Sequence, residues 1–447
     1  MQKFHVVTLG CKINQYESEA VAEAWRAGGM AETNSPAEAQ VLLVNSCAVT
    51  SRAVSDLRTT VRRLRKGNPT ARIVVTGCAA QVLREELSAM PEVDAVVPQE
   101  SKAALLQGPA GPFELYTPPA AKPESGPPRR TFPPFAIGSF HRARAVVKVQ
   151  DGCSHRCTYC IVPLTRGRSV SRDPAEAIAE MRRLLNAGYR ELVVSGVNLR
   201  QYGRDLPEPL DFWDLLARAE AELAPEWAGR ARLRLSSVEP GQLDAKALDV
   251  LGASRLVAPH LHLSLQSGDA EVLRRMGRGH YRPEQAQEMI AALRRFWPRM
   301  GLGADILTGF PGETAEQFEN TCAYCRELPL TYAHVFPYSP RPGTPASTMP
   351  DALPKTERTA RAATLRGIAE AKKRAFAKEL VALPQLTVLL ERVQHGQGVG
   401  VCEFYTSCVV HGEGLTSGTM TTGSLVSMRP QELAEGKVSG TLCGDRP

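Results

Sequence analysis

The sequence has no long apolar run. Nothing in its 447 residues approaches the roughly 18 apolar residues of a membrane span. The opening segment MQKFHVVTLGC places small residues before a cysteine, as a lipoprotein signal does, but its apolar run is too short and its charged region almost absent. Apolar residues make up 43% and charged residues 23%, which is typical of soluble globular proteins. We therefore expect a cytoplasmic protein without membrane contact.

Cysteine is scarce, with 11 residues in the whole chain. This number is too small for a disulfide scaffold, and in a reducing compartment clustered thiols indicate metal binding or catalysis. The sequence also lacks heptad repeats. Its net charge of +7 permits a polyanionic partner without requiring one. The length predicts two to four domains.

The first 108 residues alternate strand and helix patterns, which predicts a parallel sheet covered by helices. One unit occurs three times: an apolar strand, a small residue, and then Cys11, Cys47 or Cys78. Ligands of open parallel sheets bind beyond the carboxyl ends of the strands. These three thiols are therefore candidates for one shared site. The alternative is that each is a small buried residue at a strand end.

Residues 109–138 are rich in proline, with nine prolines between 109 and 135, and predict a semi-rigid linker. Six strand patterns alternating with helical segments follow within residues 139–375. They predict a partial (β/α)6 barrel with its site on the loops after the strands. The six strands are expected at residues 145–149, 191–195, 232–236, 261–265, 302–307 and 332–337. A basic helix at 356–380 precedes a small β-barrel expected at 380–447, with short strands at 386–393, 409–411, 423–430 and 437–442. The fold class is therefore α/β with a terminal β-barrel.

The segment DGCSHRCTYC places Cys153, Cys157 and Cys160 on the loop after the first barrel strand. Structural zinc needs four ligands, and His155, between two of the cysteines, is badly placed as the fourth. An iron–sulfur cluster fits better, because thiolates are its standard ligands. With three ligands, a four-iron cluster keeps one iron open to a reactant. Cys322 and Cys325, inside a helical pattern, are interpreted as core residues.

The C-x3-C-x2-C spacing after the first barrel strand resembles the radical S-adenosylmethionine (SAM) superfamily. LGCKINQYES, VNSCAVT and TGCAAQ, joined to VKVQDGCSHRCTYCIVP, resemble the methylthiotransferases, and GCKINQ resembles the branch that acts on N6-threonylcarbamoyladenosine in tRNA. The resemblance implies an amino-terminal methylthiotransferase domain, a radical SAM barrel and a terminal RNA-binding barrel of the TRAM type. It also implies two 4Fe–4S clusters that act in catalysis. One would be held by Cys11, Cys47 and Cys78, and the other by Cys153, Cys157 and Cys160.

The same resemblance implies a SAM site, in which the open iron chelates SAM and the reduced cluster cleaves it to methionine and a 5′-deoxyadenosyl radical. Tyr159 would pack against the adenine. Other positions that match the SAM site are Ser195, Gly196, Asn198, Ser237, Glu239, Gln266, Gly309 and Glu313. For each, a purely structural role in a βα turn is the alternative.

Arginines that follow the cysteine loop, Arg166, Arg168 and Arg172, are candidate contacts to RNA phosphates. The alternative is an ordinary solvated surface. The terminal segment EGLTSGTMTTGSLVSM departs from the family pattern, because it is poor in aromatic and basic residues. As partners we expect tRNA and an electron donor, and we expect a monomer.

The expected reaction is insertion of a methylthio group at adenine C2 of N6-threonylcarbamoyladenosine next to the anticodon. Alternatives with the same chemistry are isopentenyl-adenosine in tRNA or an aspartate of a ribosomal protein. An alternative of another class is a non-catalytic nucleic-acid-binding protein with structural metal sites. Colour and iron content separate these classes, because two four-iron clusters give a brown protein with about eight irons.

Overall fold

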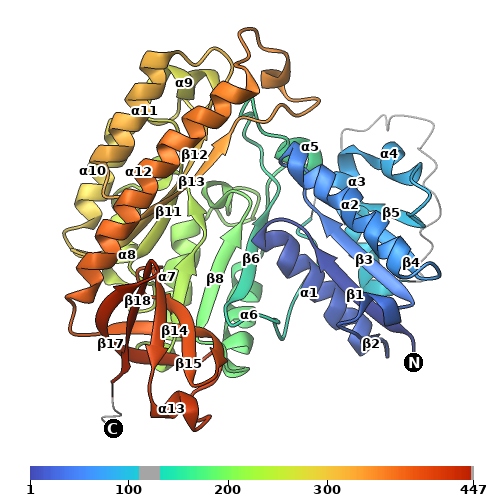
Figure 1. Cartoon of the computed structure of the whole chain (residues 1–447), viewed down its shortest axis with the longest axis horizontal. Helices are drawn as coiled ribbons and strands as arrows, with labels where there is room; N and C mark the ends of the chain where they lie inside the picture. Colours follow the sequence, from blue (N-terminus) through green and yellow to red (C-terminus); the bar gives the residue numbers. More distant parts are fainter. Residues whose placement is uncertain (110–130, 444–447) are drawn as a thin grey trace.

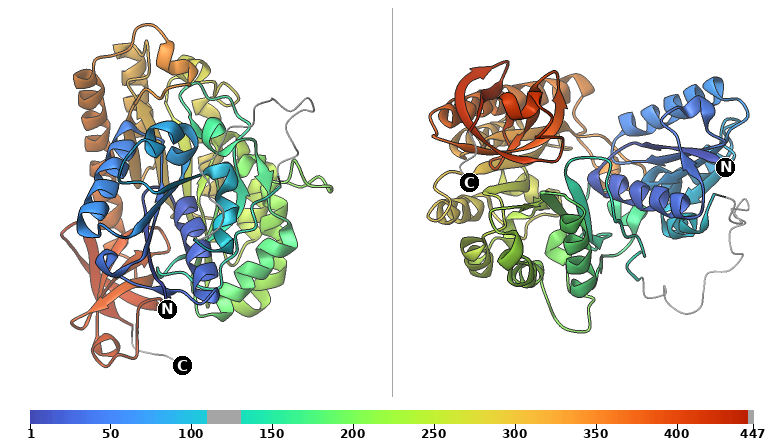
Figure 2. Two further views of the ribbon diagram at one scale, coloured as in Figure 1. Left: turned by 90° about the vertical axis from the view of Figure 1, so that its right-hand side faces the viewer. Right: turned by 90° about the horizontal axis from the view of Figure 1, so that it is seen from below.

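The computed structural model describes residues 1–109 and 131–443 (Figure 1). An amino-terminal α/β part and a terminal β-barrel both lie against a central part (Figure 2). The predicted linker falls largely on residues 110–130, which lie outside the described residues, and it stays a prediction. Its last residues are not a simple spacer, because Phe135 and Ile137 are buried in the main core. Within the described residues, no helix is long and apolar enough to cross a membrane.

The amino-terminal part is a five-stranded parallel sheet in the order β2-β1-β3-β4-β5, as predicted. Its strands are β1 (Lys3–Thr8), β2 (Ala31–Glu32), β3 (Val41–Ser46), β4 (Arg72–Gly77) and β5 (Ala95–Pro98). The covering segments are α1 (Lys12–Ala27), α2 (Ser51–Gly67), α3 (Cys78–Val82), α4 (Arg84–Ser88) and η2 (Gln99–Gln107). Strand β3 is apolar on both faces because Val41 and Leu43 pack in the core with α1, whereas Leu42 and Val44 pack in the core with α2.

The central part contains all six predicted strands. They are β6 (Ala145–Asp151), β8 (Glu191–Gly196), β9 (Arg232–Leu235), β11 (His260–Gln266), β12 (Gly301–Thr308) and β13 (Tyr332–Pro337). Short strands β7 (Val170–Ser171) and β10 (Ser237–Val238) complete two sheets, β7-β6-β8-β9 and β10-β11-β12-β13. The sheets follow one another because β9 and β10 are consecutive in the chain and Leu233 bridges to Val257. The result is the predicted open barrel.

Helices cover the outer face of the central barrel (Figure 1). The longer ones are α6 (Pro174–Asn186), α7 (Phe212–Trp227), α8 (Ala245–Ala253), α10 (Pro283–Leu293), α11 (Ala315–Glu327) and α12 (Lys355–Val381). Along β12, alternate residues Leu302, Ala304 and Ile306 are buried in the main core. The residues between them face the other way, and Asp305 there lies in register with His334 of β13. The inner face of the barrel is therefore free to carry polar groups.

The terminal part is a closed barrel in the order β14-β15-β16-β18-β17, as predicted. Its strands are β14 (Leu386–Gln394), β15 (Gln397–Cys402), β16 (Ser407–His411), β17 (Leu425–Ala434) and β18 (Lys437–Leu442). Strand β15, which contains two glycines, was not predicted. The barrel is anchored to β9, where Arg232 donates to the Thr387 and Val401 carbonyls and Arg234 to the Cys402 carbonyl.

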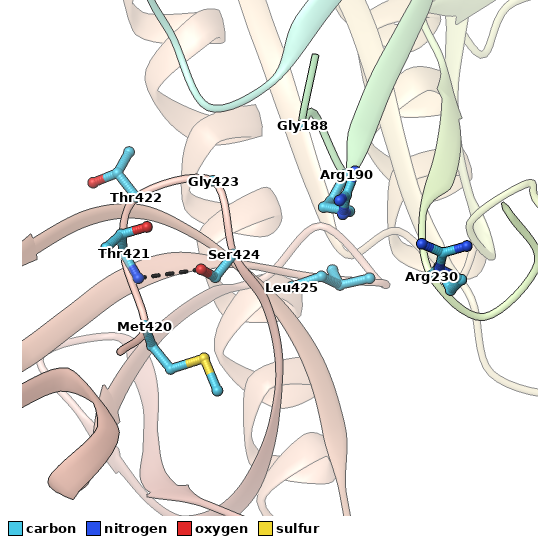
Figure 3. Close-up of a pocket in the computed structure, with 9 residues that line it drawn as sticks. All are labelled: Gly188, Arg190, Arg230, Met420, Thr421, Thr422, Gly423, Ser424 and Leu425. Carbon is cyan, nitrogen blue, oxygen red and sulfur yellow. Dashed lines mark hydrogen bonds between the residues drawn. The ribbon is translucent and has the colours of Figure 1, made fainter. Parts of the chain in front are cut away.

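A pocket of about 360 Å³ lies at this junction (Figure 3). Arg190 and Arg230, which precede β8 and β9, face the terminal-barrel loop at residues 420–425. Both arginines lie at the amino-terminal ends of the central strands. The pocket is therefore at the opposite end of the barrel from the cysteine loop, which follows the carboxyl end of β6.

Candidate functional site

The first set of cysteines lies at the carboxyl ends of three adjacent strands. Cys11 and Cys47 follow β1 and β3, and Cys78 begins α3 directly after β4. The preceding glycines make this convergence possible. A Cβ atom at Gly10 would lie 2.7 Å from the Cys47 Cβ, and one at Gly77 would lie 2.3 Å from the Ser46 carbonyl oxygen. Both glycines also have left-handed φ angles, +123° and +98°, which other residues rarely adopt.

The three thiols of this set interact electrostatically. Burial, helped by the Cys78 and Cys11 thiolates, raises the pKa of Cys47 to about 11, although the Val49 amide opposes the change. Three thiols at neighbouring strand ends, with Cys47 unfavourable as a free anion, are suited to a cationic, thiophilic group. The donor set therefore fits the iron–sulfur cluster that the family resemblance implies at these cysteines.

The second set lies on the loop after β6, and this loop is fixed by its neighbours. The Thr158 amide donates to the Met276 carbonyl at 3.0 Å, and its hydroxyl donates to the Arg275 carbonyl at 2.9 Å. At the start of the loop, the Cys153 amide donates to the Gly167 carbonyl at 3.0 Å. The spacing of the three cysteines is thus set on a rigid turn.

Polar side chains surround the sulfurs of this second set. Asn198 Nδ2 and Gln201 Nε2 lie 3.7 and 3.6 Å from Cys153 Sγ, and an Arg278 Nη1 lies 3.9 Å from Cys157 Sγ. Such donors stabilise ligating thiolates. Without a metal, burial and the Cys157 and Cys153 thiolates raise the pKa of Cys160 to about 12. The residues present therefore fit a cluster held by Cys153, Cys157 and Cys160.

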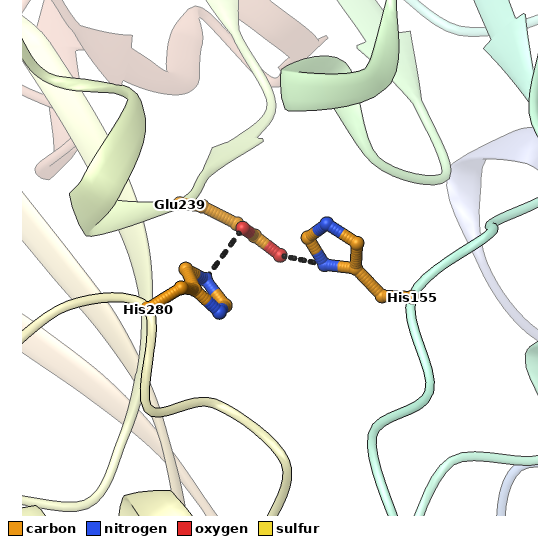
Figure 4. A group of neighbouring side chains, drawn as sticks. All are labelled: His155, Glu239 and His280. Atoms are coloured by element: carbon orange, nitrogen blue, oxygen red, sulfur yellow. Dashed lines mark hydrogen bonds and ion pairs between the residues drawn. The ribbon is translucent and has the colours of Figure 1, made fainter.

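A buried carboxylate, Glu239, lies beside this loop (Figure 4). Its oxygens are 3.3 Å from His155 Nδ1, 3.1 Å from His280 Nε2 and 3.5 Å from an Arg278 Nη1. Burial acts to raise the pKa of Glu239, but hydrogen bonds from His155 and His280 and the charge of Arg278 hold it well below its usual value. The site thus contains a fixed carboxylate anion able to accept hydrogen bonds.

His155, Arg278 and His280 were not among the predicted site residues. His155 lies between two cysteines of the motif, and this position was the one available signal. Arg278 and His280 belong to the loop after α9 (Ala270–Arg275), and their segment has no distinctive sequence pattern. Only the folded chain brings them to Glu239, about 40 residues earlier.

The predicted SAM residues gather at the carboxyl ends of the barrel strands. Ser195 and Gly196 end β8. The amide nitrogen Nδ2 of Asn198 lies between Cys153 and Glu239, and its distance to Glu239 Oε1 is 3.1 Å. Ser237 is exposed next to Glu239. Gln266 ends β11 with a left-handed φ of 65°, which is uncommon for a residue with a side chain. Contact of these residues with SAM stays a prediction.

Glu313 and Gly309 together fix the loop after β12. The Gly309 amide donates to Glu313 Oε2 at 2.8 Å, and Arg361 donates to the same oxygen at 2.7 Å. The Glu313 carboxylate therefore stabilises the loop, which is the structural role stated as the alternative. Tyr159 packs against the small apolar cluster that includes Phe310 and Tyr338.

Two of the three predicted RNA contacts need correction. Arg166 is buried and donates to Glu17 at 2.8 Å and to Asp151 at 2.9 Å. Arg172 is also buried and donates to Glu180 at 2.8 Å. Because both guanidinium groups are enclosed and paired with carboxylates, neither is placed to meet a phosphate. Arg168 is exposed, and its contact with RNA stays a prediction.

The loop after β13 contacts both cysteine regions. The hydroxyl of Ser339 in this loop accepts a hydrogen bond from the Ser51 amide at 3.3 Å, and Ser51 is four residues after Cys47. The Ala346 amide of the same loop donates to the carbonyl of Thr158, between Cys157 and Cys160, at 2.8 Å. The two sets of cysteines therefore border one region, where the amino-terminal part meets the barrel mouth.

A row of rings lies on the inner face of edge strand β13. The Tyr332 and His334 rings are 5.5 Å apart, and the His334 and Phe336 rings are 6.3 Å apart. Phe336 is 46% exposed. A pocket of about 680 Å³ beside Tyr332 and His334 is also lined by Tyr405 and by the cations Arg366 and Lys373. Rings together with cations are the lining that unstacked bases and phosphates require.

Comparison with known proteins agrees with this arrangement. Residues 3–98 match the uncharacterized protein family UPF0004, and residues 147–325 match the radical SAM superfamily. The chain is 36% identical to the threonylcarbamoyladenosine tRNA methylthiotransferase MtaB of Rickettsia prowazekii, over 81% of each chain. It is 36% identical to the MtaB of Bacillus subtilis, over 78% of this chain and 75% of the relative.

Another relative is the tRNA-2-methylthio-N(6)-dimethylallyladenosine synthase of Chromobacterium violaceum, with 33% identity over 88% of each chain. Among solved structures, the radical SAM methyltransferase TsrM of Kitasatospora setae, with cobalamin and a [4Fe-4S] cluster bound, shares the fold. Its TM-score is 0.52 at 16% identity, covering 78% of this chain and 77% of that one. With both cysteine regions inside the matched segments, the chain belongs to the radical SAM methylthiotransferase family, in its MtaB branch.

Proposed function

We propose that this protein inserts a methylthio group at adenine C2 of N6-threonylcarbamoyladenosine in tRNA, next to the anticodon. The observation that carries the proposal is the loop after β13, which contacts both cysteine regions. An adenine held there would meet both sites at once. The names of the MtaB relatives support the threonylcarbamoyl nucleoside as substrate.

Each set of three cysteines would hold a 4Fe–4S cluster and leave one iron for a reactant. When bound, SAM and the cluster on the barrel loop supply one-electron chemistry that can break an unactivated C–H bond. Asn198, Gln201 and Arg278 would orient the sulfurs of that loop by donating to them. Glu239, held as an anion, would accept hydrogen bonds from ribose hydroxyls of SAM.

The tRNA would approach the region between the two cysteine sets. Arg168 is exposed beside the cysteine loop, and the rings of β13 offer surfaces on which unstacked bases can lie. An electron donor must deliver electrons to the barrel cluster. Because its proposed substrate is tRNA, we propose that the enzyme acts in the cytoplasm, and because one chain supplies both cysteine sets, we propose that it acts as a monomer.

Nucleoside mass spectrometry of tRNA tests the proposed function. A strain without this gene should lose the methylthio form of N6-threonylcarbamoyladenosine and keep the unmodified nucleoside. Complementation with Cys47→Ala or Cys157→Ala should fail, whereas Cys325→Ala should restore the product, because Cys325 packs in the core between helix and sheet. Loss of the methylthio form of isopentenyl-adenosine instead would show that the alternative substrate is correct.

A further inference from the structure

Three polar side chains lie together on the inner face of the central barrel, across three adjacent strands. His262 belongs to β11, Asp305 to β12 and His334 to β13, and these strands are neighbours in one parallel sheet (Figure 1). Asp305 is in register with His334, and His262 is in register with Gly303, two residues before Asp305 on the same face. Strand pairing therefore brings one carboxylate and two imidazole groups together.

The two histidine rings direct a nitrogen atom at the same carboxylate oxygen. His262 Nε2 lies 3.0 Å from Asp305 Oδ1, and His334 Nδ1 lies 3.3 Å from the same atom. One ligand atom from each of the three side chains lies within 4.8 Å of the other two. Nitrogen and oxygen ligands at about 2.0–2.1 Å from a tetrahedral zinc ion lie about 3.3 Å from one another. The spacing of the donors therefore suits one small cation.

The Asp305 carboxylate is an anion without a permanently charged partner. Burial acts to raise its pKa, but hydrogen bonds from His262 and His334 hold it well below its usual value. Within residues 1–109 and 131–443, its ion pairs are with these two histidines, and no lysine or arginine lies at ion-pair distance. Glu239, by contrast, also pairs with Arg278. A metal ion beside Asp305 therefore replaces ring protons and displaces no fixed cation.

The His262 ring is held in the orientation that a metal ligand needs. Its second nitrogen, Nδ1, lies 2.9 Å from the Tyr332 hydroxyl. Metal-binding histidines almost always donate from their second nitrogen to such a partner, which fixes both the ring and its tautomer. Tyr332 can accept this proton and donate its own to His260 Nε2, which also lies at 2.9 Å. The chain of hydrogen bonds thereby leaves His262 Nε2 free to act as a ligand.

Solvent reaches the three side chains on the side of His334. The His334 side chain is 55% exposed and that of Asp305 is 22% exposed. His334 also lines the pocket of about 680 Å³ described above. An ion can therefore enter from this pocket, and coordination positions that the protein does not fill would face water.

We propose that His262, Asp305 and His334 form a binding site for a divalent transition-metal ion, separate from both cysteine sets. Two imidazole nitrogens and one carboxylate oxygen are ligands that zinc and ferrous ions accept, and three protein ligands leave positions open for water. The ion would join β11, β12 and β13 at the open edge of the barrel. This site contains no thiol, and the inference is independent of the proposed function.

Zinc is the probe, because cluster iron would conceal a bound ferrous ion. Protein whose iron content shows that both cysteine sets are occupied is incubated anaerobically with Zn²⁺ and freed of unbound metal. Mass spectrometry measures zinc per chain, and X-ray absorption at the zinc edge identifies the ligands. The variants are His334→Ala, Asp305→Asn and Tyr332→Phe. The control is His411→Ala, which removes an exposed histidine of the terminal barrel.

Wild type and His411→Ala should bind about one zinc ion per chain, with nitrogen and oxygen at about 2.0–2.1 Å and no sulfur at about 2.3 Å. His334→Ala and Asp305→Asn should lose this zinc. Tyr332→Phe keeps all three ligands and should bind zinc about 10–100-fold more weakly. Iron content per chain equal to that of wild type shows that each variant keeps its fold.

Absence of bound zinc in wild type would overturn the inference, and this measurement needs no variant. Sulfur among the zinc ligands would also overturn it, because the zinc would then be bound by cysteines. The third contrary result is equal zinc in wild type and His334→Ala. Removal of this largely exposed ring leaves the core intact, so zinc retained by the variant would show that His334 is not a ligand.

Discussion

Arg166 illustrates how a basic residue beside a reactive loop can serve the fold. Besides its contacts with Glu17 and Asp151, it donates to Asn14 at 2.7 Å. Burial acts to lower the pKa of Arg166, but the Glu17, Cys78 and Asp151 charges raise it well above its usual value. Arg168, two residues later, is exposed. The two arginines therefore form a matched pair for mutagenesis.

Replacement of Arg166 by alanine should lower the free energy of unfolding by about 3–5 kcal/mol, because it leaves Glu17 and Asp151 buried with less compensation. Arg168→Ala should change it by less than about 0.5 kcal/mol. It should instead lower the slope of log affinity for tRNA against log salt by about 0.7–0.9. Urea unfolding and salt titrations measure these effects. Equal stability of the two variants would contradict the assigned role of Arg166.

At the scale of the element, successive side chains of β13 point to opposite faces of the sheet, so that its two faces have different surroundings. Val335 packs in the core, whereas Tyr332, His334 and Phe336 present their rings to the inner face. As the last strand in its sheet, β13 leaves this row beside an open edge. One strand thus packs into the core with one face and presents a row of rings with the other.

Phe336→Ala should weaken tRNA binding by about 1–3 kcal/mol if a base stacks on this ring. Phe336→Tyr keeps the ring and is the matched control, so its affinity should stay close to that of wild type. Filter binding under anaerobic conditions measures both. Identical losses in the two variants would show that stacking is not the interaction at this position.

Glu191 at the start of β8 joins three elements. It pairs with Arg232 and Arg234 of β9, and both arginines continue to backbone carbonyls of the terminal barrel. Burial acts to raise the pKa of Glu191, but the charges of Arg234 and Arg232 lower it to about 2. The carboxylate therefore anchors the terminal barrel only while it is ionised.

The acid stability of the protein should depend on Glu191. Since its pKa falls from 4.5 in the unfolded chain to about 2, its contribution is full above about pH 4.5 and is lost as the pH falls toward 2. The shift corresponds to about 3 kcal/mol. Urea unfolding should show Glu191→Gln less stable than wild type at pH 7, with a smaller difference at pH 3. A difference independent of pH would contradict this account.

At the scale of the whole molecule, a buried ionic network joins the amino-terminal part to the central barrel. Glu17 of α1 accepts from Lys102 at 2.6 Å, Lys148 of β6 at 2.7 Å and Arg166 at 2.8 Å. Burial acts to raise the pKa of Glu17, but the charges of Arg166, Lys102 and Lys148 hold it well below its usual value. The network fixes α1 against β6 and thereby the position of one cysteine set relative to the other.

Glu17→Gln should separate the two halves of the reaction. SAM cleavage without tRNA should persist, because every residue of the barrel loop is retained, whereas methylthio product should fall at least about tenfold as the buried cations lose their partner. Paired assays of 5′-deoxyadenosine and methylthio nucleoside measure the ratio. Parallel loss of both products would show that the network supports the barrel site itself.

The sequence by itself determined the elements and both cysteine sets. Strands were visible because apolar residues are locally continuous or alternate, and Cys153, Cys157 and Cys160 were visible because their spacing is local. The repeated strand–cysteine unit also indicated where Cys11, Cys47 and Cys78 meet, because parallel strands end at one edge. Strand β15 was missed, since its glycines weaken the pattern that signals a strand.

Only the tertiary structure decided which charges are buried and which are paired with one another. The sequence suggested that Arg166 contacts RNA, but in the folded chain Arg166 is paired with Glu17, which is 149 residues away. Glu239 became a fixed anion because distant His155 and His280 meet it. Burial and charge pairing are sums over contacts distant in sequence, so no local pattern can report them.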